Sequence, residues 1–321
     1  MNARFLVLLL LAWLPVARAD WYADTQDKMG TRVEVQLWHD DAAVAEALLS
    51  DAMAEFDRIE AGMSTYIASS EISLVNREAA QRPVAVSVEL YALIELSLKL
   101  SEVTGGAFDI SYDSVGQLYN YRQQQRPDSA QIEARLGSID YRYVSLDPAT
   151  SSVRFGADGV RINLGGIAKG YSVESVITLL REAGVQHALA TAGGDTRLLG
   201  DRHGKPWIVG VRDPDDESGL VTRIGLVDEA VSTSGDYERF FIEDGVRYHH
   251  ILDPGTGRPA SDVRSATIVG PDATMTDGLS TSVFVLGPEK GIELIESLDG
   301  YEAIVVDTER NVRFSTGLDP R

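Results

Sequence analysis

Residues 163–170 read Asn163-Leu164-Gly165-Gly166-Ile167-Ala168-Lys169-Gly170, and the order of the strands and helices on either side of this octet indicates the fold. A strand is predicted over Val160–Asn163, and a helix over Ala168–Ala183, ended by Gly184. Two glycines between them let the backbone approach a ligand closely, and the free N–H groups of a helix start favour an anion. Lys169 lies in the first helical turn, where its ammonium can pair with a phosphate. The octet is therefore either a phosphate site or an ordinary tight turn.

The glycine spacing excludes two common nucleotide-binding motifs. Neither Gly-x-x-x-x-Gly-Lys-Ser/Thr nor Gly-x-Gly-x-x-Gly occurs in the octet. A P-loop or a dinucleotide-binding βαβ unit is not expected here.

On both sides of the octet, strands and helices alternate without a regular βαβ rhythm. The predicted strands are Thr31–Trp38, Tyr141–Leu146, Ser152–Phe155, Val160–Asn163, His187–Thr191, Thr196–Leu199, Trp207–Arg212, Arg223–Leu226, Tyr248–Leu252, Ala266–Val269, Glu302–Asp307 and Val312–Ser315. The predicted helices are Asp41–Glu60, Ser87–Val103, Gln131–Leu136, Ala168–Ala183, Asp277–Leu286 and Pro288–Leu298. This order predicts an α+β fold, with mixed or antiparallel sheets and packed helices, rather than a doubly wound parallel sheet. The acidic stretch Asp213–Ser218 is predicted to be a loop.

The N-terminus has the features of a secretory signal peptide. Arg4 precedes an apolar run from Phe5 to Val16, and Ala17-Arg18-Ala19 supplies a small-x-small cleavage site. The alternative, a membrane anchor, needs roughly 20 apolar residues, more than this run contains. We expect cleavage after Ala19, and no Cys lies nearby to carry a lipid. The expectation is a periplasmic, unanchored protein in which residues 20–321 form one domain, since no Pro-, Gly- or Ser-rich linker divides them.

Composition narrows the chemistry. The chain has 321 residues and no Cys, which excludes disulfides, a thiol nucleophile and a Cys-bound metal. Loss of residues 1–19 lowers the Lys and Arg count from 29 to 27 and leaves 49 Asp and Glu, a formal charge of −22. Such a surface repels nucleic acid and anionic lipid, so neither is expected as a partner. A phosphate-bearing substrate would need a cation to offset that charge locally.

Residues 276–281, Thr-Asp-Gly-Leu-Ser-Thr, supply oxygen ligands of the kind that Mg²⁺ prefers. Helical spacing puts Asp277 and Thr281 on one face, with Ser280 beside them. The alternative is that Asp277 merely complements the dipole of its own helix near the N-terminus.

A predicted strand delivers His249 and His250 to the turn Asp253-Pro254-Gly255. Neighbouring side chains of a strand face opposite sides, so one imidazole is expected at a site and the other exposed. A neutral imidazole can serve as a general base near pH 7, although a structural role is the alternative. Two further segments, Met63–Tyr66 and Gly105–Ile110, combine small residues, an aromatic and polar groups. Each can hold a flat aromatic ligand, or be no more than a loop and a helix cap.

Taken in order, these segments resemble the FAD:protein FMN transferases, the ApbE-type flavin transferases. The resemblance runs from Met29 to about Gly287, and its parts lie in the order of the family. They are Met29-Gly30-Thr31, Met63–Tyr66, Ser70–Ser73 with Asn76, Gly106–Ile110, Leu164–Tyr171, Gly193-Gly194-Asp195, Ser232–Tyr237 with Arg239, the His249–Pro254 turn and Asp277–Thr281.

The resemblance implies a Mg²⁺-dependent transfer of the FMN half of FAD to a Ser or Thr hydroxyl of a target protein, with release of AMP. The implied target is a flavoprotein subunit of an exported or membrane-bound electron-transfer complex. By position, the implied FAD contacts are Met29, Tyr66, Ala107, Phe108, Asp109, Asn163, Lys169 and Leu252. The implied metal ligands are Gly166 through its carbonyl, Asp277 and Thr281, with Ser280 as a fourth candidate. His250 is our choice for the base that orients or deprotonates the hydroxyl, beside the catalytic metal ligand Asp277.

Two departures and three alternatives accompany the resemblance. Asn163 stands where the family often has Asp, which keeps a polar contact but not the charge, and the usual Pro-Leu is missing around Asp113–Tyr119. An FAD pyrophosphatase of the same family would use water as the acceptor. A non-catalytic periplasmic FAD-binding protein would need no metal at the pyrophosphate. A structural exported protein has only export and acidity in its favour.

Overall fold

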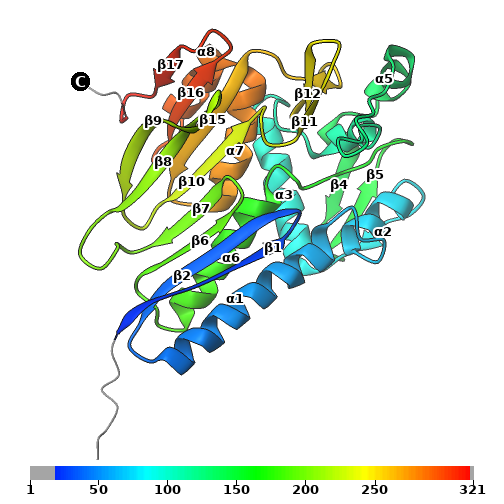
Figure 1. Ribbon diagram of the computed structural model, residues 1–321. Helices are drawn as coiled ribbons and strands as arrows, with labels where there is room; N and C mark the ends of the chain where they lie inside the picture. The colour runs from blue at the N-terminus through cyan, green and yellow to red at the C-terminus, as the bar shows by residue number, and fades with distance from the viewer. Residues whose placement is uncertain (1–18, 319–321) are drawn as a thin grey trace, which may run out of the picture.

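An antiparallel sheet of eight strands forms the larger body of the fold (Figure 1). The computed structural model describes residues 19–318, so all but the last residue of the predicted signal peptide lies outside it. In spatial order the strands are β1 (Asp20–Lys28), β2 (Thr31–His39), β6 (Ala188–Ala192), β7 (Asp195–Leu199), β10 (Ala230–Gly235), β15 (Val263–Gly270), β16 (Glu302–Asp307) and β17 (Val312–Phe314). Every neighbouring pair is antiparallel.

Helices cover one face of this sheet. They are α1 (Ala42–Met63), α6 (Ala168–Glu182), α7 (Ala273–Leu286) and α8 (Pro288–Glu296). Alternate residues of β2, Val33, Val35 and Leu37, are fully buried, and they belong to one cluster with Val173 and Val176 of α6. The larger body is therefore built around a core between helices and sheet.

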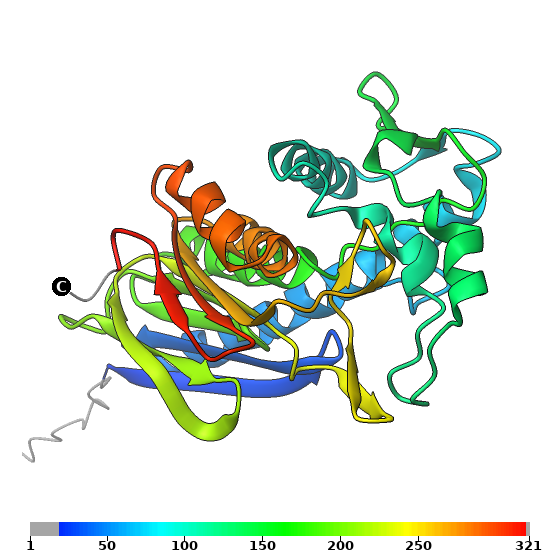
Figure 2. The same cartoon turned by 90° about the horizontal axis from the view of Figure 1, so that it is seen from above.

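A two-stranded hairpin of β8 (Trp207–Asp213) and β9 (Asp216–Leu226) packs at the other side of the sheet (Figure 2). Trp207 and Leu226 of the hairpin are buried against Leu198, Val231 and Val269 of the sheet. The sheet is thus covered on parts of both faces.

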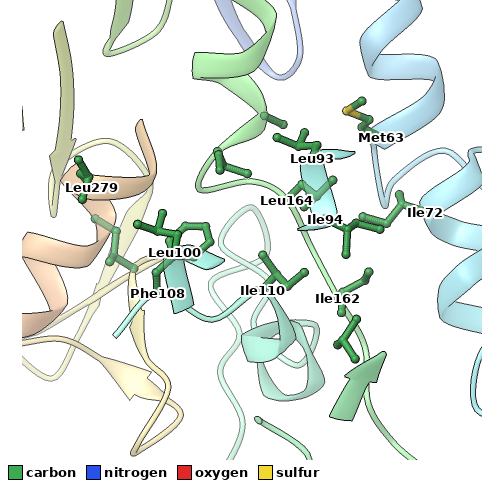
Figure 3. Close-up of a cluster of buried hydrophobic side chains, with 14 of the residues drawn as sticks. Met63, Ile72, Leu93, Ile94, Leu100, Phe108, Ile110, Ile162, Leu164 and Leu279 are labelled. Atoms are coloured by element: carbon green, nitrogen blue, oxygen red, sulfur yellow. The ribbon is translucent and has the colours of Figure 1, made fainter. Parts of the chain in front are cut away.

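A smaller body lies beside the helical face. It contains the sheet β3-β5-β4 (Val84–Ala85, Ser152–Phe155 and Val144–Asp147), α2 (Glu71–Glu78), α3 (Val88–Val103), α4 (Asp113–Gly116) and α5 (Ser129–Leu136). One hydrophobic cluster joins the two bodies (Figure 3). In it, Leu100 and Phe108 lie beside Leu279 of α7, and the Leu100 side chain fills the space that a Cβ on Gly278 would take. The helix that carries the predicted metal ligands is therefore packed from both sides.

The α+β class with antiparallel sheets and packed helices is confirmed, but several local predictions are wrong. Residues 160–163 form no strand, because side chains from other parts of the chain form the hydrogen bonds with their backbone N–H groups that a neighbouring strand would otherwise form. Asn76 Oδ1 accepts from Ile162 N–H at 2.8 Å, and Ser114 Oγ accepts from Arg161 N–H at 3.0 Å. Tyr141–Tyr143 is a 3₁₀ turn before β4 rather than its first half.

The acidic stretch Asp213–Ser218 is mostly strand, not loop, since only Pro214 and Asp215 connect β8 to β9. Several elements were not predicted, among them β1, α2 and the central strand β10. β1 is an edge strand with mostly exposed or half-buried residues, so it lacks an apolar alternation, and α2 has only eight residues.

Candidate active site

The site begins where α6 crosses α7 at very close range. A Cβ on Gly170 would overlap the carbonyl oxygen of Ala273 and lie 2.6 Å from Asp277 Cβ. Only glycine lets the backbones of the two helices approach this closely. The crossing therefore depends on Gly170, the last residue of the octet quoted at the start.

Asp277 caps α6, not its own helix. α7 begins at Ala273, with Asp272 as its N-cap, so Asp277 lies in the interior of the helix and the dipole alternative for it is wrong. α6 has no side-chain cap of its own, and the Gly170 N–H donates to Asp277 Oδ2 at 2.8 Å. A carboxylate from α7 thus satisfies a free N–H group at the positive end of α6.

Lys169 lies between two carboxylates. Its Nζ forms an ion pair with Asp195 Oδ2, at the start of β7, and lies 3.5 Å from Asp277 Oδ1. Burial lowers the pKa of Lys169, but the charges of Asp195 and Asp277 outweigh it and hold the pKa above its ordinary value. Lys169 is therefore a fixed ammonium at the first turn of α6.

Asp195 and Asp277 together carry more negative charge than the single ammonium of Lys169 neutralises. Burial, and then the charge of Asp195, raise the pKa of Asp277, against the opposing effect of Lys169. Asp195 is almost fully buried, and its Oδ1 has no hydrogen-bond partner. A buried anionic oxygen without a partner is costly, and a bound cation would satisfy it.

Neutral oxygen donors complete the cluster. A Cβ on Gly166 would lie 3.2 Å from Thr281 Oγ1, so the octet touches α7 at a second point. Thr281 Oγ1 lies 3.4 Å from Ser234 Oγ of β10. The Ser280 hydroxyl is directed elsewhere: it donates to the Asp277 carbonyl oxygen at 2.8 Å and lies 2.8 Å from Ser234 Oγ. The structure therefore brings Gly166, Asp277 and Thr281 together, with Ser280 behind them.

This donor set consists of oxygen atoms, which suit a hard cation such as Mg²⁺. Within residues 19–318 no group of three or more His, Asp or Glu is arranged to hold a metal ion. Mg²⁺ is bound through one or two carboxylates and keeps waters and phosphate oxygens in its shell. Asp277, with the unpartnered oxygen of Asp195 nearby, meets that requirement.

Both histidines of the predicted pair face inward, so the expectation that one is exposed is wrong. β12 (Val246–His249) ends before His250, and the chain turns into β13 (Leu252–Asp253). His249 is buried and donates through Nε2–H to the Ala260 carbonyl oxygen at 2.8 Å. His250 Nδ1 is buried without a partner. Burial, with the charges of Arg239 and Lys169, lowers the pKa of His250 to about 3, so its imidazole is neutral at pH 7.

The predicted flavin contacts fall into two sets. Tyr66 is 89% exposed and follows Thr65, whose Oγ1 accepts from Asn163 Nδ2 at 3.4 Å, and the Phe108 ring lies against Gly166. Met29 adopts a positive φ of 53°, and its N–H donates to Glu60 Oε2 at 2.9 Å. Of this first set, Tyr66 is exposed, Ala107 is half-buried and Phe108 is buried.

The side chains of three other predicted flavin contacts already form hydrogen bonds or pack within the protein. Asp109 accepts from Ser111 and from the Tyr141 N–H at 2.9 Å, which makes it a turn cap. Asn163 Oδ1 accepts from the Gly165 N–H at 2.8 Å and so shapes the octet. The Leu252 side chain is buried with Val115, Tyr119 and Ile132.

Asp195 and Ser234 are site residues that the sequence analysis does not single out. Each lies within a motif quoted for the family resemblance, Gly193-Gly194-Asp195 and Ser232–Tyr237, and that is the signal that could have found them. Their relation to Lys169 and Thr281 depends on strand packing, which no local pattern reveals.

Comparisons with known proteins show what the chain is similar to. A sequence profile of the ApbE family matches residues 29–305. An FAD:protein FMN transferase of Treponema pallidum is 34% identical over 95% of this chain and 90% of its own length. A protein of the same name from Klebsiella pneumoniae is 33% identical, and 90% of each chain is covered.

Solved structures of the family superpose closely. The ApbE protein of Thermotoga maritima matches with a TM-score of 0.86 at 33% identity, over 93% of this chain and 98% of that one. A flavin transferase ApbE from Vibrio cholerae matches with a TM-score of 0.84 at 27% identity, over 94% and 99% of the two chains. The protein is thus an enzyme of the transferase class. More particularly, it belongs to the ApbE family.

Proposed function

We propose that this protein transfers the FMN half of FAD to a Ser or Thr hydroxyl of another protein and releases AMP, with Mg²⁺ as cofactor. The observation that carries the proposal is the cluster of Lys169, Asp195 and Asp277 at the start of α6, together with His250, whose buried Nδ1 has no partner and whose pKa is lowered in part by the charge of Lys169. Curated relatives named FAD:protein FMN transferase support the substrate. The chain has no Cys, and the nucleophile in this reaction belongs to the acceptor.

Gly166, Asp277 and Thr281 are the residues that would hold Mg²⁺, and Asp195, which pairs with the same Lys169 as Asp277, would add negative charge to the site. The ion would neutralise charge on the pyrophosphate oxygens, which phosphoryl transfer requires more than covalent help. The set consists of oxygen donors, and Asp195 Oδ1 is the buried oxygen left without a partner. The site therefore suits the ion by its chemistry.

Lys169 and the first turn of α6 bind and orient the pyrophosphate. The Lys169 ammonium is held in place by Asp195, so it meets the phosphate with little loss of side-chain freedom. The Gly165-Gly166 turn lets the backbone come close to the phosphate, and the helix start favours an anion there. Both groups offset the charge that builds up on the leaving AMP.

His250 accepts the proton of the attacking hydroxyl. The acceptor oxygen forms a bond to the FMN phosphorus while the bond from that phosphorus to the bridging oxygen of AMP breaks. AMP leaves with that oxygen, and the hydroxyl proton passes to His250 Nδ1, which has no other partner. The low pKa of His250 keeps this nitrogen free of a proton in the resting enzyme.

Hydrolysis is the second candidate, because water can take the place of the hydroxyl at the same site. The wide exposure of Tyr66, a predicted flavin contact, favours a protein acceptor, since a large partner can reach that residue. A storage role without chemistry would not need the Lys169–Asp195–Asp277 cluster.

Export to the periplasm belongs to the proposal as well. It rests on Arg4, the apolar run Phe5–Val16 and the Ala17-Arg18-Ala19 site in the sequence. In the part of the chain that the structure covers, no helix is both long and apolar enough to cross a bilayer. The acceptors proposed are accordingly exported or membrane-bound subunits of electron-transfer complexes.

The test is an assay of FAD with Mg²⁺, with and without candidate acceptor domains, in which AMP, free FMN and protein-bound FMN are quantified. We expect AMP and protein-bound FMN in equal amounts, and little free FMN. The variant His250→Gln should bind FAD as before and transfer about 100-fold or more slowly, the usual contribution of a general base. Free FMN formed at the full rate without an acceptor would replace this proposal by hydrolysis.

A further inference from the structure

A second cavity of about 380 Å³ lies behind the histidine pair, at the base of the hairpin formed by β11 (Phe240–Glu243) and β12. Five separate parts of the chain line it. They are Tyr119 with Arg126 and Pro127, Asp236 after β10, residues 246–249 of β12, the stretch from β14 (Arg258–Pro259) to Val263, and Thr308 after β16. None of the residues proposed above to bind FAD or Mg²⁺ lines it.

The lining is cationic, although the protein as a whole has a formal charge of −20. Arg126, Arg247 and Arg258 contribute guanidinium groups, and Asp236 is the one carboxylate among the lining residues. Arg126 pairs with Glu243 on the hairpin, and Arg247 pairs with Asp236 at 3.0 Å. Such a local reversal of charge attracts an anion in an otherwise repulsive field.

Arg258 is the group available to a ligand. It is exposed, and Ser129 Oγ lies 2.9 Å from its Nη2. Within residues 19–318 no carboxylate lies at ion-pair distance from it. A guanidinium with unused donors binds carboxylates in a bidentate geometry.

The walls of the cavity are preorganised by aromatic packing. The Tyr119 and Tyr121 rings stack with centroids 5.9 Å apart, and Phe241 stacks on Tyr248 at 5.3 Å. Arg126 lies over the Tyr248 ring, 4.9 Å from its centroid. The Tyr121 hydroxyl donates to the His249 carbonyl oxygen at 3.2 Å. The hairpin is thus held to the smaller body, so a ligand meets a formed site with little ordering cost.

One peptide unit separates this cavity from the active site. His249 lines the cavity, and the next residue, His250, carries the unpartnered Nδ1 of the proposed base. The His250 N–H donates to the Arg239 carbonyl oxygen at 3.1 Å and closes the base of the hairpin. A protein whose hydroxyl reaches His250 must therefore lie against the hairpin.

The hairpin projects from the body, as Figure 2 shows. It carries apolar side chains in contact with solvent. Phe240, Ile242 and Val246 are 37%, 59% and 51% exposed. An apolar tip beside a cationic cavity is the composition of a protein-binding surface, with apolar contacts and a charged group that fixes the orientation.

We propose that the acceptor protein docks on the β11–β12 hairpin and places a carboxylate side chain in the arginine-lined cavity, bound by Arg258, while Arg126, paired with Glu243, adds positive charge to the same cavity. This inference rests on the proposed function, since it assumes that the acceptor is a protein. The acceptor then carries Asp or Glu near the modified Ser or Thr, and the cavity selects for it.

The experiment uses the variant Arg126→Glu/Arg258→Glu and a control with the same change of charge, Arg223→Glu/Lys290→Glu, at two exposed positions away from the cavity. The probes are three synthetic peptides that share a central Thr and differ in flanking residues: Glu, Gln or Lys. Binding of fluorescent forms is measured by anisotropy without FAD, and FMN attachment by mass spectrometry with FAD and Mg²⁺.

We expect the wild type and the control to bind the Glu-flanked peptide at least about 10-fold more tightly than the Lys-flanked one. The cavity variant should lose or reverse this preference while FAD affinity and thermal unfolding stay unchanged. Arg258→Gln, a milder change, should show part of the loss if the double variant folds poorly. An excess of inorganic phosphate should compete only weakly, because a free anion lacks the hairpin contacts.

Equal binding of the three peptides by the wild type, or a preference that survives in the cavity variant, would overturn the inference. Because the binding arm contains no FAD, its result is independent of the transfer reaction. Absence of FMN on all three peptides, together with a clear preference for Glu in binding, would count against the proposed transfer and leave the docking site standing.

Discussion

The Gly170 N–H of α6 donates a hydrogen bond of 2.8 Å to Asp277 Oδ2 of α7. This one contact joins the helix start proposed to bind phosphate to the carboxylate proposed to bind Mg²⁺, two features 107 residues apart in the chain. It exists because Gly170 has no side chain to keep the two helices apart. The following predictions start from this crossing.

Gly170→Ala should destabilise the fold by about 1–3 kcal/mol or more, because the added methyl group overlaps the Ala273 carbonyl oxygen. The matched control is Gly62→Ala in α1, where nothing lies within 4 Å of the added Cβ. That change should stabilise the protein by roughly 0.5–1 kcal/mol through helix propensity. Denaturant unfolding of both variants checks the pair, and equal effects at the two positions would contradict the crossing.

Asp277→Ala should lower the rate of Mg²⁺-dependent FAD cleavage by at least about 100-fold, while much of the flavin binding remains. Ser280→Ala should have a smaller effect, because the Ser280 hydroxyl is bonded to the Asp277 carbonyl oxygen and faces Ser234. AMP release and quenching of flavin fluorescence separate cleavage from binding. A Ser280→Ala enzyme as inactive as Asp277→Ala would make Ser280 a metal ligand.

Asp195→Asn should weaken Mg²⁺ binding about 10- to 100-fold, because it removes the buried charge whose Oδ1 has no protein partner. The substitution keeps the size of the side chain and one contact to Lys169. Calorimetric titration with Mg²⁺ in the absence of FAD measures the effect directly. If Asp195 serves only to hold Lys169, metal affinity will be unchanged and FAD affinity alone will fall.

Stability should decrease as pH falls from about 6.5 to 4, in part through His249. Burial lowers the pKa of His249 to about 4, and the charges of Arg247 and Arg264 act in the same direction. Its neutral form satisfies both ring nitrogens, since Nδ1 accepts from the Ile251 N–H at 3.3 Å and Nε2–H donates to Ala260. The unfolded chain, with a pKa of about 6.5, binds more protons in this window, so the free energy of unfolding rises with pH.

The contribution of His249 is on the order of 2–3 kcal/mol, present above about pH 6.5 and lost toward pH 4. His249→Gln keeps a donor for Ala260 and does not titrate, so it should flatten the curve of unfolding free energy against pH. His250, with a pKa lowered to about 3, should retain a similar slope of its own. Denaturant melts between pH 4 and 8 test this, and parallel curves for wild type and variant would contradict it.

The sequence predicts most helices because their ends carry local signals. Asp41 caps α1 and Ser87 caps α3 through side-chain bonds to the first free N–H groups. The conformation of residues 160–163 could not be predicted in this way, because their hydrogen-bond partners, Asn76 and Ser114, are distant in the chain. Extended backbone that bonds to side chains has the same residue pattern as a strand.

The residues of the candidate site also divide into those that a local pattern predicts and those that depend on tertiary packing. Lys169, Asp277 and Thr281 are recognisable from their motifs, since helical spacing places the last two on one face. Asp195 joins them only through the packing of β7 against α6. The orientation of the two histidines could not be predicted either, because the strand breaks at His250, and alternation of side chains applies only within a continuous strand.

The most direct measurement of the central claim is the intact mass of an acceptor protein after incubation with this enzyme, FAD and Mg²⁺. We predict a mass increase equal to FMN less one water, carried on a Ser or Thr, with one AMP released for each FMN attached. His250→Gln and Asp277→Ala should each prevent it. AMP and free FMN in equal amounts, with every acceptor unchanged in mass, would contradict the account.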